Sequence, residues 1–148
     1  MEANIEAIRV AGTPDGPVPV VLLQPENKEN VLPIFIGFDE AISIARGLDA
    51  VDIGRPLTHD LLLDVIEELG SRVSKIVISA VEDNTFIADL HLNTPRDTIT
   101  IDARPSDSLA LAARTNADIE ITESVYEQSQ RDPSEFEDLE DIREVTQL

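Results

Sequence analysis

Apolar and polar residues along the first 38 positions form a pattern typical of three β-strands. Each strand-like segment is rich in Val, Ile and Leu, and a cluster of turn-forming residues separates it from the next. The turns read "TPDGP" and "PENKEN", in which Pro, Gly, Asn and Asp favour a change of chain direction. We therefore expect strands over residues 5–12, 18–24 and 31–38.

The pattern then changes to the three- and four-residue spacing of amphipathic helices. The first predicted helix covers residues 39–49, where Asp39 can cap its start. The second follows an Arg-Pro pair, with Thr58 as its cap, and Gly70 is placed to end it. The apolar faces consist of Ile42, Ala45 and Leu48 in the first helix and Leu61, Leu62, Val65, Ile66 and Leu69 in the second.

Strands followed by a helix are predicted a second time in the rest of the chain. Apolar residues dominate segments 74–81, 85–92 and 98–103, and the short turn "EDN" makes the first two a hairpin. A helix is expected over 106–115 and a last strand over 119–125. The predicted fold class is therefore α+β.

The two halves also resemble each other in sequence. "PIFIGFDEAISIA" aligns with "TITIDARPSDSLALA" when the second copy has two extra residues, and this alignment pairs Glu40 with Asp107. A competing alignment places "GRPLTHDLLLDVIEELG" (54–70) on "DARPSDSLALAARTN" (102–116) through their Arg-Pro pairs. The first explains more residues, because it also pairs Ile34 with Ile99, Ile36 with Ile101 and Ile42 with Leu109. We therefore predict an internally duplicated strands-then-helix unit.

Residues 131–148 differ from the domain that precedes them, which we place at 1–130. The segment is acidic, and Ser134 with Glu137 matches a capping box. Its apolar residues lie three apart, at Phe136, Leu139, Ile142 and Val145. These features predict a short amphipathic helix. Two roles stay open for it: packing on its own domain, or docking a partner or a second subunit.

Charge changes the expectation for partners. The chain has 30 acidic and 11 basic residues, which give a formal net charge of −19, and nine of the basic residues are Arg. An acidic, Lys-poor surface suits molar salt, where the Debye length falls to about 3 Å. In dilute buffer this charge repels nucleic acid, whereas at high salt it acts only over short distances. We expect a halophilic protein, and an ordinary acidic protein with an acidic tail stays open as the alternative. We expect any nucleic-acid partner to be bound at high salt through short-range contacts.

Several classes of site are excluded by the residues that the chain lacks. It has no Cys, which removes disulfides, thiolate zinc sites and cysteine nucleophiles. No apolar run reaches the length of a membrane span, and the first residues lack the order of a signal peptide. The motifs of P-loop NTPases, serine hydrolases, zinc proteases and dinucleotide-binding proteins are absent as well. We expect a cytoplasmic protein with no membrane contact and no organic cofactor.

The two Arg-Pro pairs are the first candidates for chemistry. Pro disfavours helical backbone at the preceding residue, so Arg55 and Arg104 are expected just before a helix start. Thr58 and Ser106 can cap these helices, and an Asp follows in each first turn, where the helix dipole favours a carboxylate. A positively charged Arg at the positive end of a helix dipole is unfavourable unless it contacts an anion. Two interpretations stay open. The arginines can hold the fold by pairing with a nearby carboxylate, Arg55 with Asp60 and Arg104 with Asp107 or Asp102, or they can bind a substrate phosphate.

One histidine and several carboxylates complete the candidate site. His59 lies in the first turn of the second helix, where the dipole favours the neutral ring of a general base, and a hydrogen-bonded structural role stays open for it. The candidate catalytic residues are Glu40, His59, Asp60 and Asp107. Asp102 and Asp107 are candidate ligands of Mg²⁺ or Mn²⁺, because hard cations take oxygen ligands.

Three motifs resemble those of the bifunctional nuclease family in sequence and order: "LPIFIGFDEAISIARGLD", "RPLTHDLL" and "IDARPSDSLALAAR". The resemblance covers residues 5–125. It implies a two-layer α+β domain with a mixed sheet and an internal duplication, activity on both DNA and RNA, and a homo-oligomer, for which we expect a dimer. The motif positions in this chain are Glu40, Arg55, Thr58, His59, Asp60, Asp102, Arg104, Ser106 and Asp107.

Two functions therefore stay open. In the first, the protein hydrolyses phosphodiester bonds in RNA or DNA with the help of a divalent metal. The two arginines then hold phosphate, His59 or Asp60 orients water, and Asp102 and Asp107 help to place the ion. In the second, the protein is a non-catalytic oligomeric module that binds a ligand or regulates a partner, and its Arg–Asp pairs are structural latches.

Overall fold

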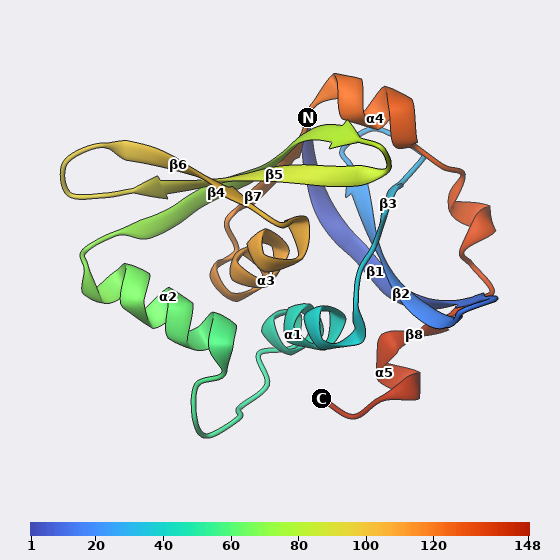
Figure 1. Ribbon diagram of the computed structural model, residues 1–148, viewed down its shortest axis with the longest axis horizontal. Helices are drawn as coiled ribbons and strands as arrows, with labels where there is room; N and C mark the ends of the chain where they lie inside the picture. The colour runs from blue at the N-terminus through green and yellow to red at the C-terminus, as the bar shows by residue number, and fades with distance from the viewer.

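A mixed β-sheet forms the framework of the protein in a computed structural model that describes all residues, 1–148 (Figure 1). The strands are β1 (Glu2–Thr13), β2 (Gly16–Pro25), β3 (Leu32–Phe35), β4 (Arg72–Glu82), β5 (Thr85–Asn93), β6 (Thr98–Ala103), β7 (Asp118–Ile121) and β8 (Glu140–Asp141). The helices are α1 (Phe38–Leu48), α2 (Thr58–Glu68), α3 (Pro105–Thr115), α4 (Glu123–Ser129) and α5 (Ile142–Val145), with a 3₁₀ turn η1 (Pro133–Glu135) before β8. The predicted α+β fold class is confirmed.

The sheet consists of two three-stranded units joined by one short strand. Its order is β3-β2-β1-β7-β4-β5-β6, and β8 pairs with β1 outside this path. All neighbours are antiparallel except β4 and β7, which are parallel. β1 meets β7 only through Glu2 and Ala3, so few hydrogen bonds join the two units there.

The order of elements is the same in the two units. Three antiparallel strands lead into a helix in each case, β1–β3 into α1 and β4–β6 into α3. Glu40 and Asp107, which the preferred alignment pairs, lie near the starts of these two helices. This order agrees with the predicted duplication, which stays a prediction because likeness of element order does not establish a common origin of the two halves.

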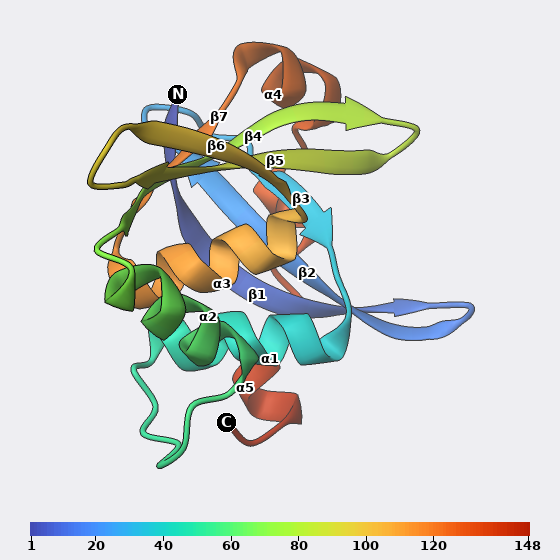
Figure 2. The ribbon, with the colours of Figure 1, turned by 60° about the vertical axis from the view of Figure 1, so that its left-hand side comes forward.

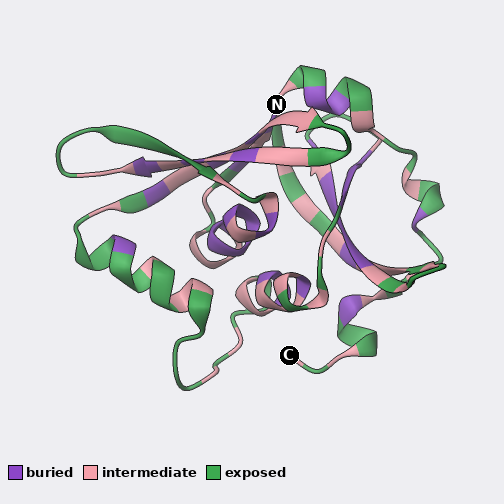
Figure 3. Ribbon diagram, viewed as in Figure 1, coloured by how far each residue is buried: buried purple, intermediate pink, exposed green.

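Helices α1 and α3 lie side by side on one side of the sheet (Figures 1 and 2). Gly47 of α1 allows this close approach, because a Cβ at this position would come within 3.0 Å of the Ala113 side chain and 3.1 Å of the Arg114 stem. Helix α2 lies at the edge of the helical layer, and only Ile66 of this helix is buried (Figure 3). The helical layer therefore consists of a tightly packed pair and a loosely held third member.

The main core lies between the helical layer and the sheet, and it contains 24 buried residues. Five of the largest, which are fully buried, are Ile8, Ile44, Ile76, Leu109 and Ile121. Burying one such side chain contributes about 1.5–3 kcal/mol. The predicted helix faces were correct only in part: Ala45 and Ile66 are buried as expected, whereas Leu48 and the rest of the expected α2 face are exposed. Most of the element boundaries nevertheless agree with the structure to within two or three residues.

The segment 131–148 packs on its own domain, but the prediction of one amphipathic helix was wrong. It forms η1, the two-residue strand β8 beside β1, and the single turn α5. β2 explains this arrangement, because successive strand residues face opposite sides: Val21 and Leu23 enter the main core, and Val20 and Leu22 need a cover on the other face. The side chain of Phe136 supplies that cover.

Three predicted helix caps and one predicted strand end also differ from the structure. Helices α1, α2 and α3 have Gly37, Leu57 and Arg104 at the N-cap, not the predicted Asp39, Thr58 and Ser106, so each helix starts one or two residues early. The last predicted strand ends at Ile121, because the Thr122 side chain accepts a hydrogen bond from the Val125 N–H and starts α4. No helix in the structure combines the length and the apolar character that a membrane span requires.

Candidate functional site

A chain of polar contacts connects α1, α2 and α3, and His59 lies at the centre of this chain. The Nδ1 atom of His59 lies 2.6 Å from the Ser43 Oγ atom on α1, and its Nε2 atom lies 2.8 Å from the Asp107 Oδ1 atom on α3. The His59 side chain is 12% exposed. Because it contacts residues of both neighbouring helices, His59 fixes the start of α2 to the α1–α3 pair.

The hydrogen bonds around Ser43 define which ring nitrogen of His59 carries the proton. The Arg114 Nη2 atom donates to the Ser43 Oγ atom at 3.2 Å, so the hydroxyl hydrogen is free to be donated to His59 Nδ1. In the neutral ring, Nε2 then carries the hydrogen and donates it to Asp107. The orientation of His59 is thus set from both sides.

Arg104 and Asp107 form the outer end of this chain of contacts. The Nε atom of Arg104 donates to Asp107 Oδ2 at 2.9 Å, and Nη2 donates to Oδ1 at 3.1 Å. The Nη1 atom lies 3.5 Å from the Glu40 carboxylate on α1. The hydrogen bond from Arg104, opposed by partial burial and supported by the one from His59, lowers the pKa of Asp107 below its usual value. Asp107 is therefore held as a carboxylate between two donors.

The local sequence explains why Arg104 faces Asp107. Arg104 has extended backbone, with φ −70° and ψ 145°, and Pro105 occupies the first helical position. This start places Asp107 three residues after Arg104, in the first turn of α3. Of the two partners expected for Arg104, Asp102 and Asp107, the structure pairs it with Asp107. The Arg104 side chain nevertheless stays 65% exposed, so several of its N–H groups face solvent.

A second ion pair holds α2 to the far end of α3. The Arg114 Nε atom donates to Asp60 Oδ1 at 2.8 Å, and Nη1 donates to the carbonyl oxygens of Ser43 and Ala110 at 2.9 Å each. Burial opposes ionisation of Asp60, but the hydrogen bonds from Arg114 and the Leu57 N–H outweigh it and lower the pKa of Asp60. Arg114 is only 8% exposed and is therefore a structural residue.

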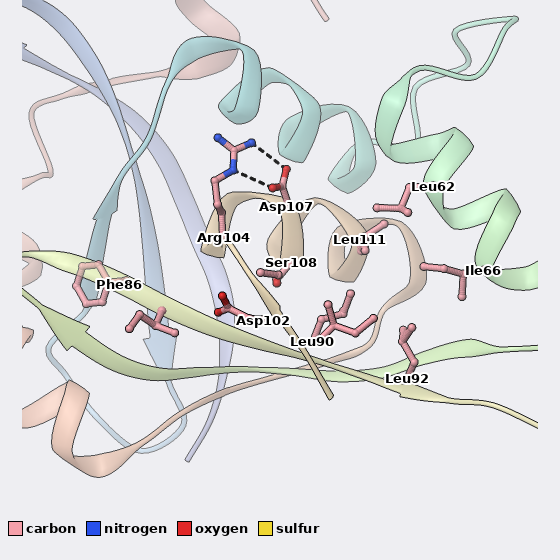
Figure 4. A pocket seen from close by; sticks show the side chains of 13 residues that line it. Leu62, Ile66, Phe86, Leu90, Leu92, Asp102, Arg104, Asp107, Ser108 and Leu111 are labelled. Carbon is pink, nitrogen blue, oxygen red and sulfur yellow. Dashed lines mark hydrogen bonds and ion pairs between the residues drawn. The ribbon is translucent and has the colours of Figure 1, made fainter. Parts of the chain in front are cut away.

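Beside Arg104 the surface forms an apolar trough of about 600 Å³ between α2, α3 and the strands β5 and β6 (Figure 4). This volume is typical of small-molecule sites. The trough has mainly apolar walls and one polar end. The apolar walls include Leu62, Ile66, Leu90, Leu92, Ile101 and Leu111, and the polar end consists of Asp102, Arg104, Asp107 and Ser108.

The predicted site residues divide into three groups in the structure. Glu40, His59, Arg104 and Asp107 lie in one continuous chain of contacts, as described above. Asp60 joins this chain through Arg114, with which it pairs, and not through Arg55. Arg55 is exposed in the loop before α2 and makes no ion pair, and Asp102 is exposed near the end of β6.

The carboxylates do not form a metal site. No group of three or more His, Asp or Glu side chains lies in an arrangement that could hold a metal ion. Both oxygens of Asp107 already accept hydrogen bonds, from Arg104 and His59, so a cation there would have to displace two donors. The residues present therefore do not fit the predicted Mg²⁺ or Mn²⁺, and no chemical step is derived through a metal.

Sequence reasoning missed Ser43 and Arg114, which complete the chain of contacts. A signal for each was available in helical spacing. Ser43 lies three residues after Glu40 in α1, and Arg114 lies seven residues after Asp107 in α3, so each shares a helix face with a predicted site residue. Neither residue belongs to an Arg-Pro pair, so the Arg-Pro motifs did not indicate them as site residues.

Comparison with known proteins identifies the family. A model of the bifunctional nuclease domain matches residues 20–134. The chain belongs to the bifunctional nuclease family. The matched region contains α1, α2 and α3 and therefore every residue of the chain of contacts. The predicted family resemblance is confirmed.

The relatives include both uncharacterized proteins and proteins named as nucleases. The chain is 39% identical over 128 residues to the uncharacterized protein Rv1829 of Mycobacterium tuberculosis. The aligned region covers 86% of this chain and 75% of Rv1829. It is 27% identical over 113 residues to bifunctional nuclease 2 of Oryza sativa subsp. japonica and 23% identical over 105 residues to bifunctional nuclease 2 of Arabidopsis thaliana. These matches cover 74% and 69% of this chain, but only 35% and 32% of the plant proteins.

Proposed function

We propose that this protein hydrolyses phosphodiester bonds in RNA or DNA at the polar end of the trough. Membership of the bifunctional nuclease family supports the class of reaction. The observation that carries the site assignment is Arg104, a largely exposed guanidinium held in place by Asp107 and facing Glu40. A fixed, exposed guanidinium is a preferred partner of phosphate oxygens.

In the proposed reaction, Arg104 contacts the phosphate through the N–H groups that Asp107 and Glu40 leave free. Its charge stabilises the negative charge that develops on the phosphate oxygens while water attacks phosphorus and the P–O bond to the leaving sugar oxygen breaks. The leaving oxygen takes a proton from solvent. Glu40 takes the proton from that water, because its carboxylate is 26% exposed and makes only one long contact with Arg104. His59 and Asp60 act as positioning residues, through Asp107 and Arg114 respectively.

A second function, a non-catalytic module whose Arg–Asp pairs are latches, is favoured by one observation. Most of the charges in the chain of contacts satisfy one another: Arg114 with Asp60, and Arg104 with Asp107. Under this alternative, substitution of Arg104 changes no catalytic activity. The two functions therefore differ in a measurable way.

The test compares Arg104→Gln with Arg96→Gln. Arg96 is exposed in the turn between β5 and β6 and its side chain makes no ion pair, so Arg96→Gln makes the same change of charge away from the site. Cleavage of labelled RNA and DNA is measured in molar KCl with Mg²⁺, with Mn²⁺ and with EDTA, beside a melting curve for each protein. We expect Arg104→Gln to lose about 10²–10³-fold of the rate, as for loss of one transition-state donor.

Both variants should melt close to the wild type, because an exposed ion pair contributes only about 0–1 kcal/mol. Equal cleavage by wild type and Arg104→Gln, or cleavage by neither, contradicts the proposed nuclease site. The EDTA arm tests the predicted metal dependence separately. A Glu40→Gln variant tests the assigned base, and it should lose activity with little change in melting temperature.

Self-association and location stay predictions. Helix α2 and the residues that cap its two ends expose several large apolar side chains, namely Leu57, Leu61, Leu62, Val65 and Leu69. We propose that they contribute to the predicted dimer, since a large exposed apolar patch usually marks an interface. Light scattering of wild type and Leu69→Asp in molar KCl tests the proposal, which a monomeric wild type contradicts. A cytoplasmic location is proposed as before.

A further inference from the structure

The apolar trough beside Arg104 contains a buried polar group that the fold leaves without a partner. The Ser108 side chain is fully buried, and its Oγ atom makes no hydrogen bond within the protein. A helical Ser commonly donates to the carbonyl four residues earlier, and Ser108 does not. Such unpaired buried groups are rare and call for an explanation.

The position of Ser108 indicates what the missing partner is. Ser108 is part of the trough lining, and Figure 4 shows it on the side of α3 that faces the strands, whereas the Arg104 guanidinium extends toward Asp107 and α1. Both residues line the trough, so a molecule that fills it lies against Ser108 and Arg104. The trough walls beyond this polar end are apolar, so the molecule needs flat or apolar faces and at least one polar atom.

Two kinds of anion have an apolar body, and Ser108 distinguishes between them. A fatty acid places its carboxylate at Arg104 and its alkyl chain in the trough, which leaves the Ser108 hydroxyl buried and unpaired. A nucleotide places its phosphate at Arg104 and its base in the trough, where nitrogen and oxygen atoms on the base edge can pair with the hydroxyl. Phe86, which also lines the trough, offers an aromatic face against which a base can stack.

We propose that the trough binds one unpaired nucleobase of a single-stranded nucleic acid while Arg104 holds an adjacent phosphate. This inference rests on the proposed function and specifies its substrate class. A base in a duplex is stacked and paired, and it enters such a trough only after it is flipped out at an energetic cost. Single strands are therefore the preferred substrate.

Two isoleucines on β6 provide a matched test. Ile101 lines the trough and Ile99 does not, although the two lie on the same face of the strand and are 41% and 38% exposed. Asp at position 101 places a negative charge against the bound strand, whereas Asp at position 99 adds the same net charge outside the trough. Ser108→Ala removes only the unpaired hydroxyl.

Affinity is measured by fluorescence anisotropy in molar KCl, with a labelled oligonucleotide as a single strand and as the matching duplex. We expect the single strand to bind at least about tenfold more tightly than the duplex, since stacking of one base is worth that much. Ile101→Asp and Ser108→Ala should weaken binding of the single strand, and Ile99→Asp should not. Decanoate serves as the competing probe and should not displace the oligonucleotide.

Equal affinity for single strand and duplex, or unchanged binding by Ile101→Asp, overturns the inference. Displacement of the strand by decanoate, or saturation of the trough by decanoate with no binding of the strand, overturns it in favour of a fatty-acid site. Cleavage is recorded in the same samples. Cleavage with no preference for single strands contradicts this inference alone, and a single-strand preference without cleavage contradicts the proposed nuclease activity alone.

Discussion

Replacing Arg114 by Met should destabilise the protein strongly, because this side chain holds all three helices of the site together. Arg114 donates to Asp60 on α2, to the Ser43 carbonyl and hydroxyl on α1, and to the Ala110 carbonyl in its own helix. Methionine keeps much of the stem packing and removes all four hydrogen bonds. It also leaves the Asp60 carboxylate without its cation.

The size of the effect follows from burial. Removing one member of a buried ion pair typically costs about 3–5 kcal/mol. Asp60 is 29% exposed, so water can take over part of its solvation, and we expect a loss near the lower limit, about 3 kcal/mol. For a chain of this size that loss lowers the melting temperature by roughly 6–12 °C.

Thermal and urea unfolding of the variant, in molar KCl, measure this loss. Arg96→Met is the control, because Arg96 is exposed and has no ionic partner, and it should melt within about 2 °C of the wild type. An Arg114→Met protein that also melts within about 2 °C of the wild type would refute the assignment of Arg114 as the structural link between the helices.

Three further outcomes follow from the same contacts. The partners of Asp107 lower its pKa in the folded state, so its ionised form stabilises the fold above the unfolded-state pKa. This contribution is lost as the pH falls through the folded-state pKa. In urea titrations, the difference in free energy of unfolding between wild type and Asp107→Asn should therefore shrink below about pH 4. The Glu40 carboxylate occupies the space that a Cβ at position 37 would take, so Gly37→Ala should displace the assigned base and reduce the rate of nucleic-acid cleavage. Gly12→Ala should leave the rate unchanged, because nothing lies within 4 Å of a Cβ there. The melting temperature should rise as KCl is raised toward molar concentration, and a fall would contradict adaptation to salt.

Local features of the chain were predictable, because they depend on neighbours in sequence. The period of apolar residues identified the strands and helices, and closeness in sequence limited the partners of Arg104 to Asp102 and Asp107, of which Asp107 is the observed one. Contacts between helices were harder to predict. Ser43, His59 and Arg114 meet because α1 and α3 pack closely at Gly47, a tertiary fact that the sequence carries only as one small residue.

The two Arg-Pro motifs illustrate the limit of reasoning from likeness in sequence. In the motif at α3, Arg104 forms an ion pair with Asp107. In the motif at α2, Asp60 forms its ion pair with Arg114, and Arg55 is exposed to solvent. Both aspartates therefore obtain their cation from α3. Similarity in sequence therefore did not predict similarity in contacts. Asp107 pairs with the arginine three residues before it, whereas Asp60 pairs with Arg114 because α2 packs against α3.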